Sequence, residues 1–269
     1  MRATTGQVSE AGVLPAGVLV CGGPEVITRH FALLCALQPV RVEADGMVCA
    51  PRSAPEAAGP ALAACPLPWR ALSEVPAWPD PPAAMVAGWY RRSPAHAAAP
   101  EGVRELIQTP GEGFGPADHA TTAMCLEQLE HLPAADAVDV GCGSGLLCQA
   151  WVALGRGRVL ACDLDGRAVD QTARSLAAAG REDRVTMRRG PVAALRAEEL
   201  GGRVLLANVP LPAHESLLSR IGRPPRAVVL SGLRPGQAAA VVVAYRALGL
   251  EIVAEDERGG FRAVSMVAA

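Results

Sequence analysis

The chain has 269 residues, half of them apolar, and a formal net charge of −2 at pH 7. This length and composition exclude a disordered tail and allow two domains, each with its own core. The near-neutral charge and the isoelectric point near 6.2 exclude a general attraction to phosphate backbones or anionic lipid. We therefore do not expect nucleic acid or a membrane among its partners.

Residues 1–103 predict a smaller N-terminal α/β domain that recognises the substrate or acts as a lid. Its first fifty residues alternate apolar runs with short polar breaks, as strands and helices of a small α/β unit do. The expected elements are a strand GVLVCG (17–22), an amphipathic helix ITRHFALLCAL (27–37), and a strand pair PVRVEA (39–44) and GMVCAP (46–51) that turns at Asp45-Gly46.

Residues 51–100 hold about half of the 23 prolines of the chain. Because proline breaks regular elements, we expect irregular chain here, with one short helix near residues 83–90. The apolar run at residues 13–21 is too short to cross a bilayer and is broken by Pro15. These features predict a cytoplasmic protein.

Residues 104–269 predict the larger domain, because apolar strand patterns alternate there with helical ones. Strands that alternate with helices and are buried on both faces indicate a doubly wound, mostly parallel, seven-stranded Rossmann-like sheet. The expected helices are residues 121–131, 145–154, 166–180 and 236–248. Asp165 is the expected N-cap of the helix at 166–180. The expected strands are AVDV, RVLACDL, RVTMR, RVLLAN, RAVVLSG, LEIVAEDE and FRAVSMV, the last two an antiparallel pair that turns at Gly259-Gly260.

A glycine-rich turn, VDVGCGSGLL (138–147), joins the first of these strands to its helix. Gly141, Gly143 and Gly145 let a ligand lie against the main chain at the helix N-terminus. The G-x-G-x-G spacing differs from the dinucleotide fingerprint, in which the third glycine comes one place later, and is typical of S-adenosylmethionine sites. We count Asp139, in the strand that leads into the turn, among the cofactor-binding residues.

The second strand ends in CDLD, and Asp163 lies there beside the glycine turn. An acidic side chain at this strand end can accept hydrogen bonds from both ribose hydroxyls of a nucleotide-like cofactor. Asp163 is therefore the expected ribose ligand, whereas Asp165 is better explained as a helix cap.

Asn208 is the only asparagine of the chain, and all 25 basic residues are arginine. The absence of lysine excludes a Walker lysine, a Schiff-base lysine and a Ser-Lys dyad. Asn208 ends the fourth strand, so its side chain points toward the reactive end of the cofactor. Its amide oxygen and a neighbouring backbone carbonyl can hold two N–H groups and direct the lone pair of an amine. A strand-end asparagine without such a role is the structural alternative.

The remaining candidate groups give weaker signals. The eight cysteines are scattered through apolar and glycine-rich runs, so we expect buried, reduced thiols. Cys142 and Cys148 have no partners at metal-ligand spacing, and we expect no metal site. His119 is a candidate general base, although an amine that arrives neutral needs none.

Taken in order, GEGFGPADHATTAMCLEQLE, VDVGCGSGLL, VLACDLDGRAV, LLANVPLPAH, VVLSGLRPGQ and GGFRAVSMV resemble the PrmA-type ribosomal-protein methyltransferases over residues 104–269. That family is S-adenosylmethionine-dependent, and an F-G-T-G-x-H-x-T-T loop covers its cofactor. The resemblance implies that Phe114, Gly115 and Thr122 line the cofactor pocket, that His119 lies near it, and that Asn208 holds the substrate amine.

The chain departs from the family pattern at several positions. Pro116-Ala117 replaces Thr-Gly in the loop, Phe261 stands where a tryptophan is expected, and the N-terminal region shows no motif match. We expect an N-methyltransferase that acts on a ribosomal or other small protein. Two alternatives stay open: a methyltransferase for a small molecule or peptide natural product, and a binding module or nicotinamide-dependent enzyme that merely shares the fold.

Overall fold

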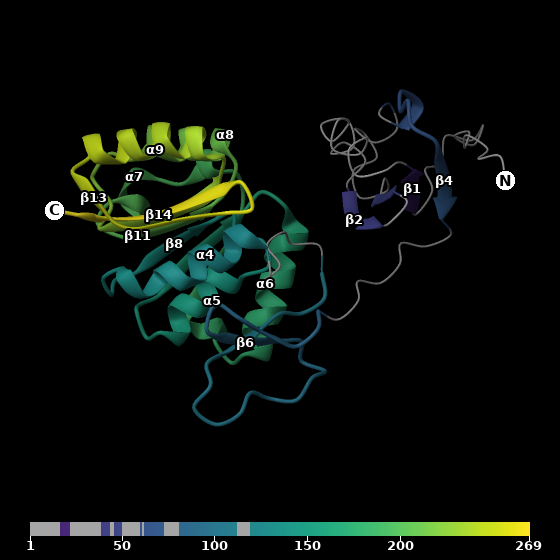
Figure 1. Ribbon diagram of the computed structural model, residues 1–269, viewed down its shortest axis with the longest axis horizontal. Coiled ribbons are helices and arrows are strands. Elements are labelled where there is room, and N and C mark those ends of the chain that lie inside the picture. The colour runs from purple at the N-terminus through teal and green to yellow at the C-terminus, as the bar shows by residue number, and fades with distance from the viewer. Residues whose placement is uncertain are drawn as a thin grey trace. The chain divides into compact units, whose positions relative to one another are not determined.

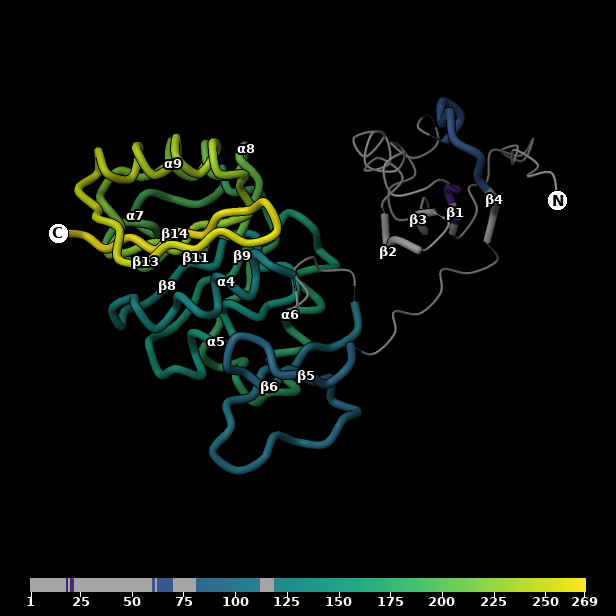
Figure 2. Tube along the Cα trace, viewed as in Figure 1, coloured from purple at the N-terminus to yellow at the C-terminus, as the bar shows by residue number. Residues whose placement is uncertain are grey.

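The computed structural model describes residues 17–21, 39–43, 46–49, 60, 62–72, 81–111 and 119–269. The chain divides into two compact units, Met1–Trp78 and Pro79–Ala269. Figures 1 and 2 show the course of the chain in each unit. Within the described residues, no helix is both long and apolar enough to cross a membrane.

The smaller unit contains a four-stranded antiparallel sheet in the order β2-β3-β1-β4. Val18, Val20 and Trp69 are buried in it, so an apolar face holds the sheet together. The predicted first strand and the following strand pair are confirmed, whereas the helix expected at residues 27–37 and the turn at Asp45 lie outside the described residues. The strands are β1 (Gly17–Cys21), β2 (Pro39–Glu43), β3 (Gly46–Cys49) and β4 (Trp69–Leu72).

The helix predicted near residues 83–90 is wrong. The irregular chain expected for residues 51–100 is found at residues 93–100, whereas strands occupy residues 69–72, 84–86 and 89–92. Strands β5 (Ala84–Val86) and β6 (Trp89–Arg92) form a hairpin there, and β7 (Glu105–Ile107) pairs with β6. Ala87 and Gly88 form the two-residue turn with φ of 52° and 77°. Two consecutive left-handed residues favour a tight hairpin and end a helix. Strands β5 and β6 precede residue 103 and β7 follows it, so this sheet includes residues from both expected domains. The functional boundary after residue 103 stays a prediction.

The larger unit is built on a seven-stranded sheet in the order β10-β9-β8-β11-β12-β14-β13. The first five strands are parallel, and β14 pairs antiparallel with both β12 and β13. This is the predicted doubly wound Rossmann-like sheet with its closing antiparallel pair. The strands are β8 (Ala137–Val140), β9 (Val159–Asp163), β10 (Val185–Arg189), β11 (Val204–Asn208), β12 (Ala227–Leu233), β13 (Leu250–Arg258) and β14 (Phe261–Ala268).

Successive side chains of the central strands enter two separate cores, because they point to opposite faces of the sheet. In β11, Val204 and Leu206 pack with α4 and α5, whereas Leu205 and Ala207 pack with α8 and α9. Figure 1 shows α4 and α5 on one face and α8 and α9 on the other. The helices are α4 (Ala120–Gln128), α5 (Leu146–Ala153), α6 (Gly166–Ala178), α7 (Ala197–Leu200), α8 (Leu211–Arg220) and α9 (Pro235–Ala247).

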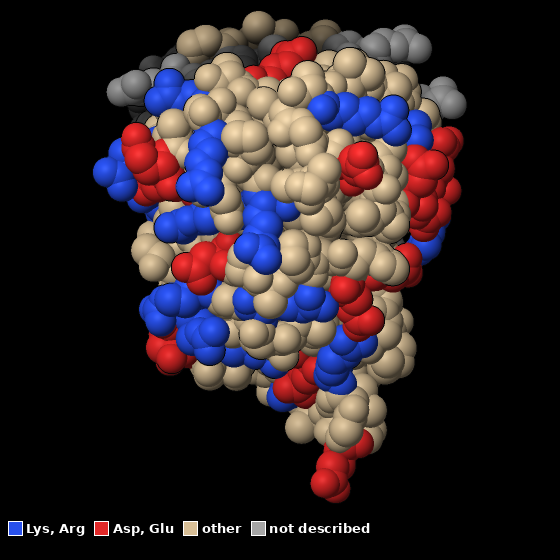
Figure 3. All heavy atoms as spheres, turned by 90° about the vertical axis from the view of Figure 1, so that its left-hand side faces the viewer, with Lys and Arg blue, Asp and Glu red and all other residues tan. Residues whose placement is uncertain are grey.

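Charged side chains of both signs are interspersed on the face drawn in Figure 3. The larger unit contains several ion pairs, among them Arg258 with Glu127 at 2.8 Å and Arg262 with Glu255 at 2.5 Å. Exposed pairs of this kind contribute about 1 kcal/mol or less each. The two apolar cores therefore dominate the stability of the larger unit.

Candidate functional site

The glycine turn follows β8 and adopts a backbone that only glycine tolerates well. Gly141, Gly143 and Gly145 have φ of 68°, 54° and 81°, in the left-handed region. A Cβ at Gly145 would lie 2.7 Å from Thr172 Cγ2 of α6. The third glycine is therefore also required for close packing of the turn against α6.

The end of β9 contacts the glycine turn through Asp163. Asp163 accepts hydrogen bonds from the Gly143 N–H at 3.0 Å and from the Asp165 N–H at 2.9 Å. Burial raises the pKa of Asp163, and these N–H groups oppose that rise. Asp163 also lines a cavity of about 450 Å³, a volume in the range of small-molecule pockets. As predicted, Asp165 caps α6 by accepting from the Arg167 N–H.

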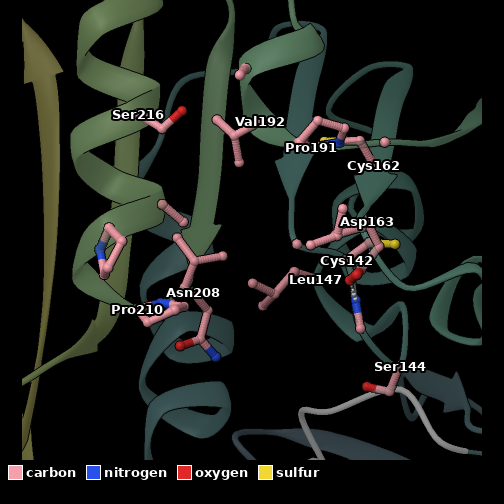
Figure 4. Close-up of a pocket in the computed structure, with 18 of the residues that line it drawn as sticks. Cys142, Ser144, Leu147, Cys162, Asp163, Pro191, Val192, Asn208, Pro210 and Ser216 are labelled. Atoms are coloured by element: carbon pink, nitrogen blue, oxygen red, sulfur yellow. Dashed lines mark hydrogen bonds between the residues drawn. The ribbon is translucent and has the colours of Figure 1, made fainter. Parts of the chain in front are cut away.

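The cavity lies at the carboxyl ends of the parallel strands, where doubly wound sheets bind ligands. In Figure 4, Asn208, Pro210 and Ser216 lie on one side of it, and Asp163 and Pro191 on the other. Most of its lining is apolar. The three predicted glycines do not all contribute equally: Gly141 and Gly143 line the cavity, whereas Gly145 is not among the described residues that line it.

Leu164 is a cavity residue that the sequence analysis missed. This residue is 70% exposed, although its side chain is large and apolar, and it lines the cavity next to Asp163. An exposed apolar surface beside a hydrogen-bonding carboxylate suits a flat heterocycle attached to a ribose. The sequence alone gives no signal for this role, because an apolar residue between the two aspartates of CDLD could equally be buried.

Asn208 lies at the cavity with a fixed amide orientation. Its Nδ2 group donates to Thr121 Oγ1 at 3.1 Å and lies 3.5 Å from Thr122 Oγ1. Its Oδ1 atom is buried and has no hydrogen-bond partner among the described residues. A buried acceptor without a partner costs free energy unless a ligand supplies a donor. An N–H or O–H group brought to Asn208 Oδ1 would satisfy this acceptor.

The loop after Asn208 packs against a glycine of β12. The Val209 N–H donates to Ser231 O at 3.2 Å, and a Cβ at Gly232 would lie 2.5 Å from Val209 O. His214 of α8, which the sequence analysis did not weigh, is fully buried and donates from Nε2 to Ser231 O at 3.0 Å. Burial lowers the pKa of His214, so the ring is neutral at pH 7. These contacts hold the loop in place.

His119 is linked to Asn208 through Thr121 and is not among the described residues that line the cavity. Its Nδ1 lies 2.8 Å from Thr121 Oγ1, and its ring centroid lies 5.6 Å from that of Phe261. The Arg234 guanidinium in turn stacks on the Phe261 ring, 4.5 Å from its centroid. Thr122 lines the cavity, whereas Phe114 and Gly115 lie outside the described residues. The predicted contact of Thr122 with a cofactor stays a prediction. A role of His119 as a base stays a prediction.

Asp139 lies behind the glycine turn and is 1% exposed. Its carboxylate accepts from the Cys148 N–H at 3.0 Å, and it is not among the described residues that line the cavity. Asp139 thus connects β8 to the first turn of α5 in this structure. Its predicted contact with a cofactor stays a prediction.

We expect Asp139→Asn to change the pH dependence of stability. Burial raises the pKa of Asp139 to about 7, from about 3.9 in an unfolded chain. Since the folded state holds the proton longer, the stabilisation is complete below about pH 4 and is lost as the pH rises through about 7. The variant keeps an acceptor for Cys148 without this titration, so it should lose less stability between about pH 4 and about pH 7.

Urea unfolding at about pH 5 and about pH 8 checks this expectation. Asp136→Asn is the matched control, because Asp136 is an exposed carboxylate directly before the same strand. Equal losses of stability with pH in the wild type and in Asp139→Asn would contradict the prediction.

Comparison with known proteins identifies a family. Residues 92–268 match the family described as Ribosomal protein L11 methyltransferase (PrmA). The chain is 38% identical over 160 residues to the ribosomal protein L11 methyltransferase of Gloeobacter violaceus, which covers 57% of this chain and 49% of the relative. It is 34% identical over 184 residues to that of Parasynechococcus marenigrum, which covers 65% and 62%. The chain thus spans about half the length of the curated relatives it matches.

A solved structure shows the same fold. It is a crystal structure of a ribosomal protein L11 methylase from Lactobacillus delbrueckii subsp. bulgaricus, with a TM-score of 0.55 and 19% sequence identity. The match covers 67% of this chain and 95% of that chain. At this level of identity, the likeness supports the Rossmann-like arrangement of the larger unit and nothing finer.

Proposed function

We infer that this chain, which belongs to the PrmA family of ribosomal protein L11 methyltransferases, uses S-adenosylmethionine to methylate a nitrogen atom of a protein substrate. One observation carries the proposal beyond the family match: the buried Asn208 Oδ1 has no partner among the described residues and belongs to a cavity residue. An amine can complete this hydrogen bond. A carboxylate cannot, because it has no proton to donate.

The residues present fit S-adenosylmethionine. Gly141 and Gly143 leave the main chain accessible, Asp163 can accept from ribose hydroxyls, and Leu164 offers an apolar surface for the adenine ring. Asp163 keeps acceptor capacity, since each carboxylate oxygen accepts only one of the two backbone hydrogen bonds described. When bound, S-adenosylmethionine supplies an electrophilic methyl group on a sulfonium sulfur.

The protein contributes orientation and exclusion of water. Asn208 Oδ1 holds one N–H of a neutral amine, so the nitrogen lone pair is directed away from the amide and toward the methyl group. With S-adenosylmethionine bound, this lone pair would form the nitrogen–carbon bond as the sulfur–carbon bond breaks, and the nitrogen would then release a proton to solvent. Alignment of two reactants can lower a barrier by about 7–11 kcal/mol, and a fixed amide dipole stabilises the positive charge that develops on nitrogen.

The family match favours a protein as the acceptor over a small molecule. The curated relatives are named for ribosomal protein L11, so we propose a ribosomal protein as the substrate, with the L11 protein of the host as the first to test. Ribosomal proteins are made and assembled in the cytoplasm, and we place the enzyme there. Residues 1–103 supply substrate recognition in this proposal.

The test incubates the purified protein with methyl-labelled S-adenosylmethionine and host lysate, and separates the products by size. We expect label in one discrete protein band, with mass spectrometry showing a methylated nitrogen. Label only in the small-molecule fraction would overturn the protein substrate. Calorimetry that shows binding of NAD and none of S-adenosylhomocysteine would overturn the methyltransferase proposal itself.

A further inference from the structure

Thr121 joins two candidate site residues through a single hydroxyl group. It is the second residue of α4 and is 1% exposed. Its Oγ1 lies 2.8 Å from His119 Nδ1 and 3.1 Å from Asn208 Nδ2. The three side chains come from positions 119, 121 and 208, so the fold rather than the sequence spacing brings them together.

The donors and acceptors of this cluster determine the direction of the amide. Asn208 Nδ2 has only protons to donate, so Thr121 Oγ1 must accept from it. The threonine proton is then available for His119 Nδ1 as an acceptor. Because Nδ2 is held at Thr121, the other end of the amide, Oδ1, is left without a partner among the described residues.

Rotation of the amide by half a turn would reverse its chemistry. The NH₂ group would then face an incoming neutral amine and donate to its lone pair, so that the lone pair could no longer attack the methyl group. We propose that Thr121 is a positioning residue that fixes Asn208 with Oδ1 available to the acceptor amine. This inference rests on the proposed function, because it names the residue that prepares the acceptor site.

Thr121 is better placed for this role than Thr122. The Thr122 hydroxyl lies at 3.5 Å from Nδ2, at the limit of a hydrogen bond, and the residue itself lines the cavity. Thr121 makes the shorter contact and is not among the described residues that line the cavity. Loss of its hydroxyl should therefore disturb the amide without removing a cofactor contact.

The single asparagine of the chain gives a direct spectroscopic test. Protein made with side-chain ¹⁵N-labelled asparagine shows one NH₂ pair in a proton–nitrogen spectrum, and that pair belongs to Asn208. In Thr121→Val, which keeps the shape and removes the hydroxyl, we expect the pair to shift and its solvent exchange to accelerate. Thr121→Ser, which keeps the hydroxyl, should restore the wild-type signal. An unchanged NH₂ pair in Thr121→Val would overturn the proposal.

Kinetics supply a second, independent readout. We expect Thr121→Val to lower kcat at least about tenfold, the effect of about one lost orienting hydrogen bond, and to leave the Kd for S-adenosylhomocysteine within about twofold. In an Asn208→Ala background, Thr121→Val should have no further effect, because the residue acts through Asn208. Additive losses in the double variant would overturn the proposed route of action.

Ser265→Ala is the matched control for a lost hydroxyl at α4. Ser265 of β14 is fully buried and donates to Gln128 Oε1 at 2.8 Å. Gln128 is the last residue of α4, at the opposite end of the helix from Thr121. We expect this variant to lose stability but to keep its kcat. An equal fall of kcat in both variants would reduce Thr121 to a general packing residue and overturn the proposal.

The two levels of inference fail in different ways. If the wild-type protein transfers no methyl group to any protein, the proposed function fails, whereas the NMR comparison still measures whether Thr121 holds the amide. If the wild type is active and Thr121→Val is equally active, the proposed function stands and the role of Thr121 is wrong.

Discussion

Substitution of Asn208 by alanine is expected to lower kcat about 100- to 1000-fold, the usual cost of removing one oriented dipole from a reacting centre. The reason is the loss of Oδ1, a buried acceptor at the cavity with no other partner among the described residues. The cofactor keeps its glycine turn and Asp163, which lie across the cavity (Figure 4). Its affinity should therefore change by no more than about threefold.

Single-turnover rates with saturating S-adenosylmethionine, together with calorimetry of S-adenosylhomocysteine, separate the two quantities. A rate loss without an affinity loss supports the orienting role. If both fall by the same factor, Asn208 acts in cofactor binding and the proposed orientation of the acceptor is wrong. Asn208→Asp is a further comparison, because aspartate has nearly the same shape as asparagine. It keeps oxygen acceptors but loses the donor to Thr121. Its negative charge also favours the protonated amine, which has no lone pair for the reaction.

The sequence allowed the positions of Gly141, Asp163 and Asn208 at the sheet edge to be predicted. Each follows the end of a parallel strand, and the carboxyl ends of such strands meet at one edge. A strand end can be located from a run of apolar residues that stops at a polar or glycine residue. The order of the strands then follows from the βα alternation, and the pairing of β8 with β9 and β11 agrees with it.

The contacts of Thr121 could not be derived in the same way. Thr121 and Asn208 are 87 positions apart, and their hydrogen bond depends on how α4 packs across the sheet. The exposed Leu164 is a similar case, because a leucine in CDLD could equally have been a buried strand residue. Periodicity locates elements, but it does not give the depth or rotation at which a helix packs.

The hairpin of β5 and β6 shows where local composition misleads. Residues 83–90 contain three alanines, which favour a helix, yet Ala87 takes a left-handed conformation and the chain reverses at Gly88. Trp89 then packs into the core on the side of α4 and α5, which explains why the hairpin is stable. Tertiary packing of one aromatic side chain outweighs a weak helix propensity.

Substitution of Asp163 by alanine is expected to weaken binding of S-adenosylhomocysteine about 100-fold, with a smaller effect on kcat at saturating cofactor. Two hydrogen bonds from ribose hydroxyls to a carboxylate are worth about 1.5–3 kcal/mol each before desolvation of the carboxylate is counted, and 2.7 kcal/mol corresponds to about 100-fold in Kd. The variant also loses the acceptor for the Gly143 N–H, so the glycine turn becomes less well held.

Asp165→Ala provides the matched control, because it removes a carboxylate two residues away that caps α6 and pairs with Arg167. Loss of this cap should cost about 1 kcal/mol of stability and leave the Kd unchanged, since Asp165 is not among the described residues that line the cavity. Calorimetry on both variants, with thermal unfolding beside it, compares them directly. Equal Kd values for Asp163→Ala and the wild type would mean that the ribose lies elsewhere, and the assignment of this cavity to the cofactor would have to be abandoned.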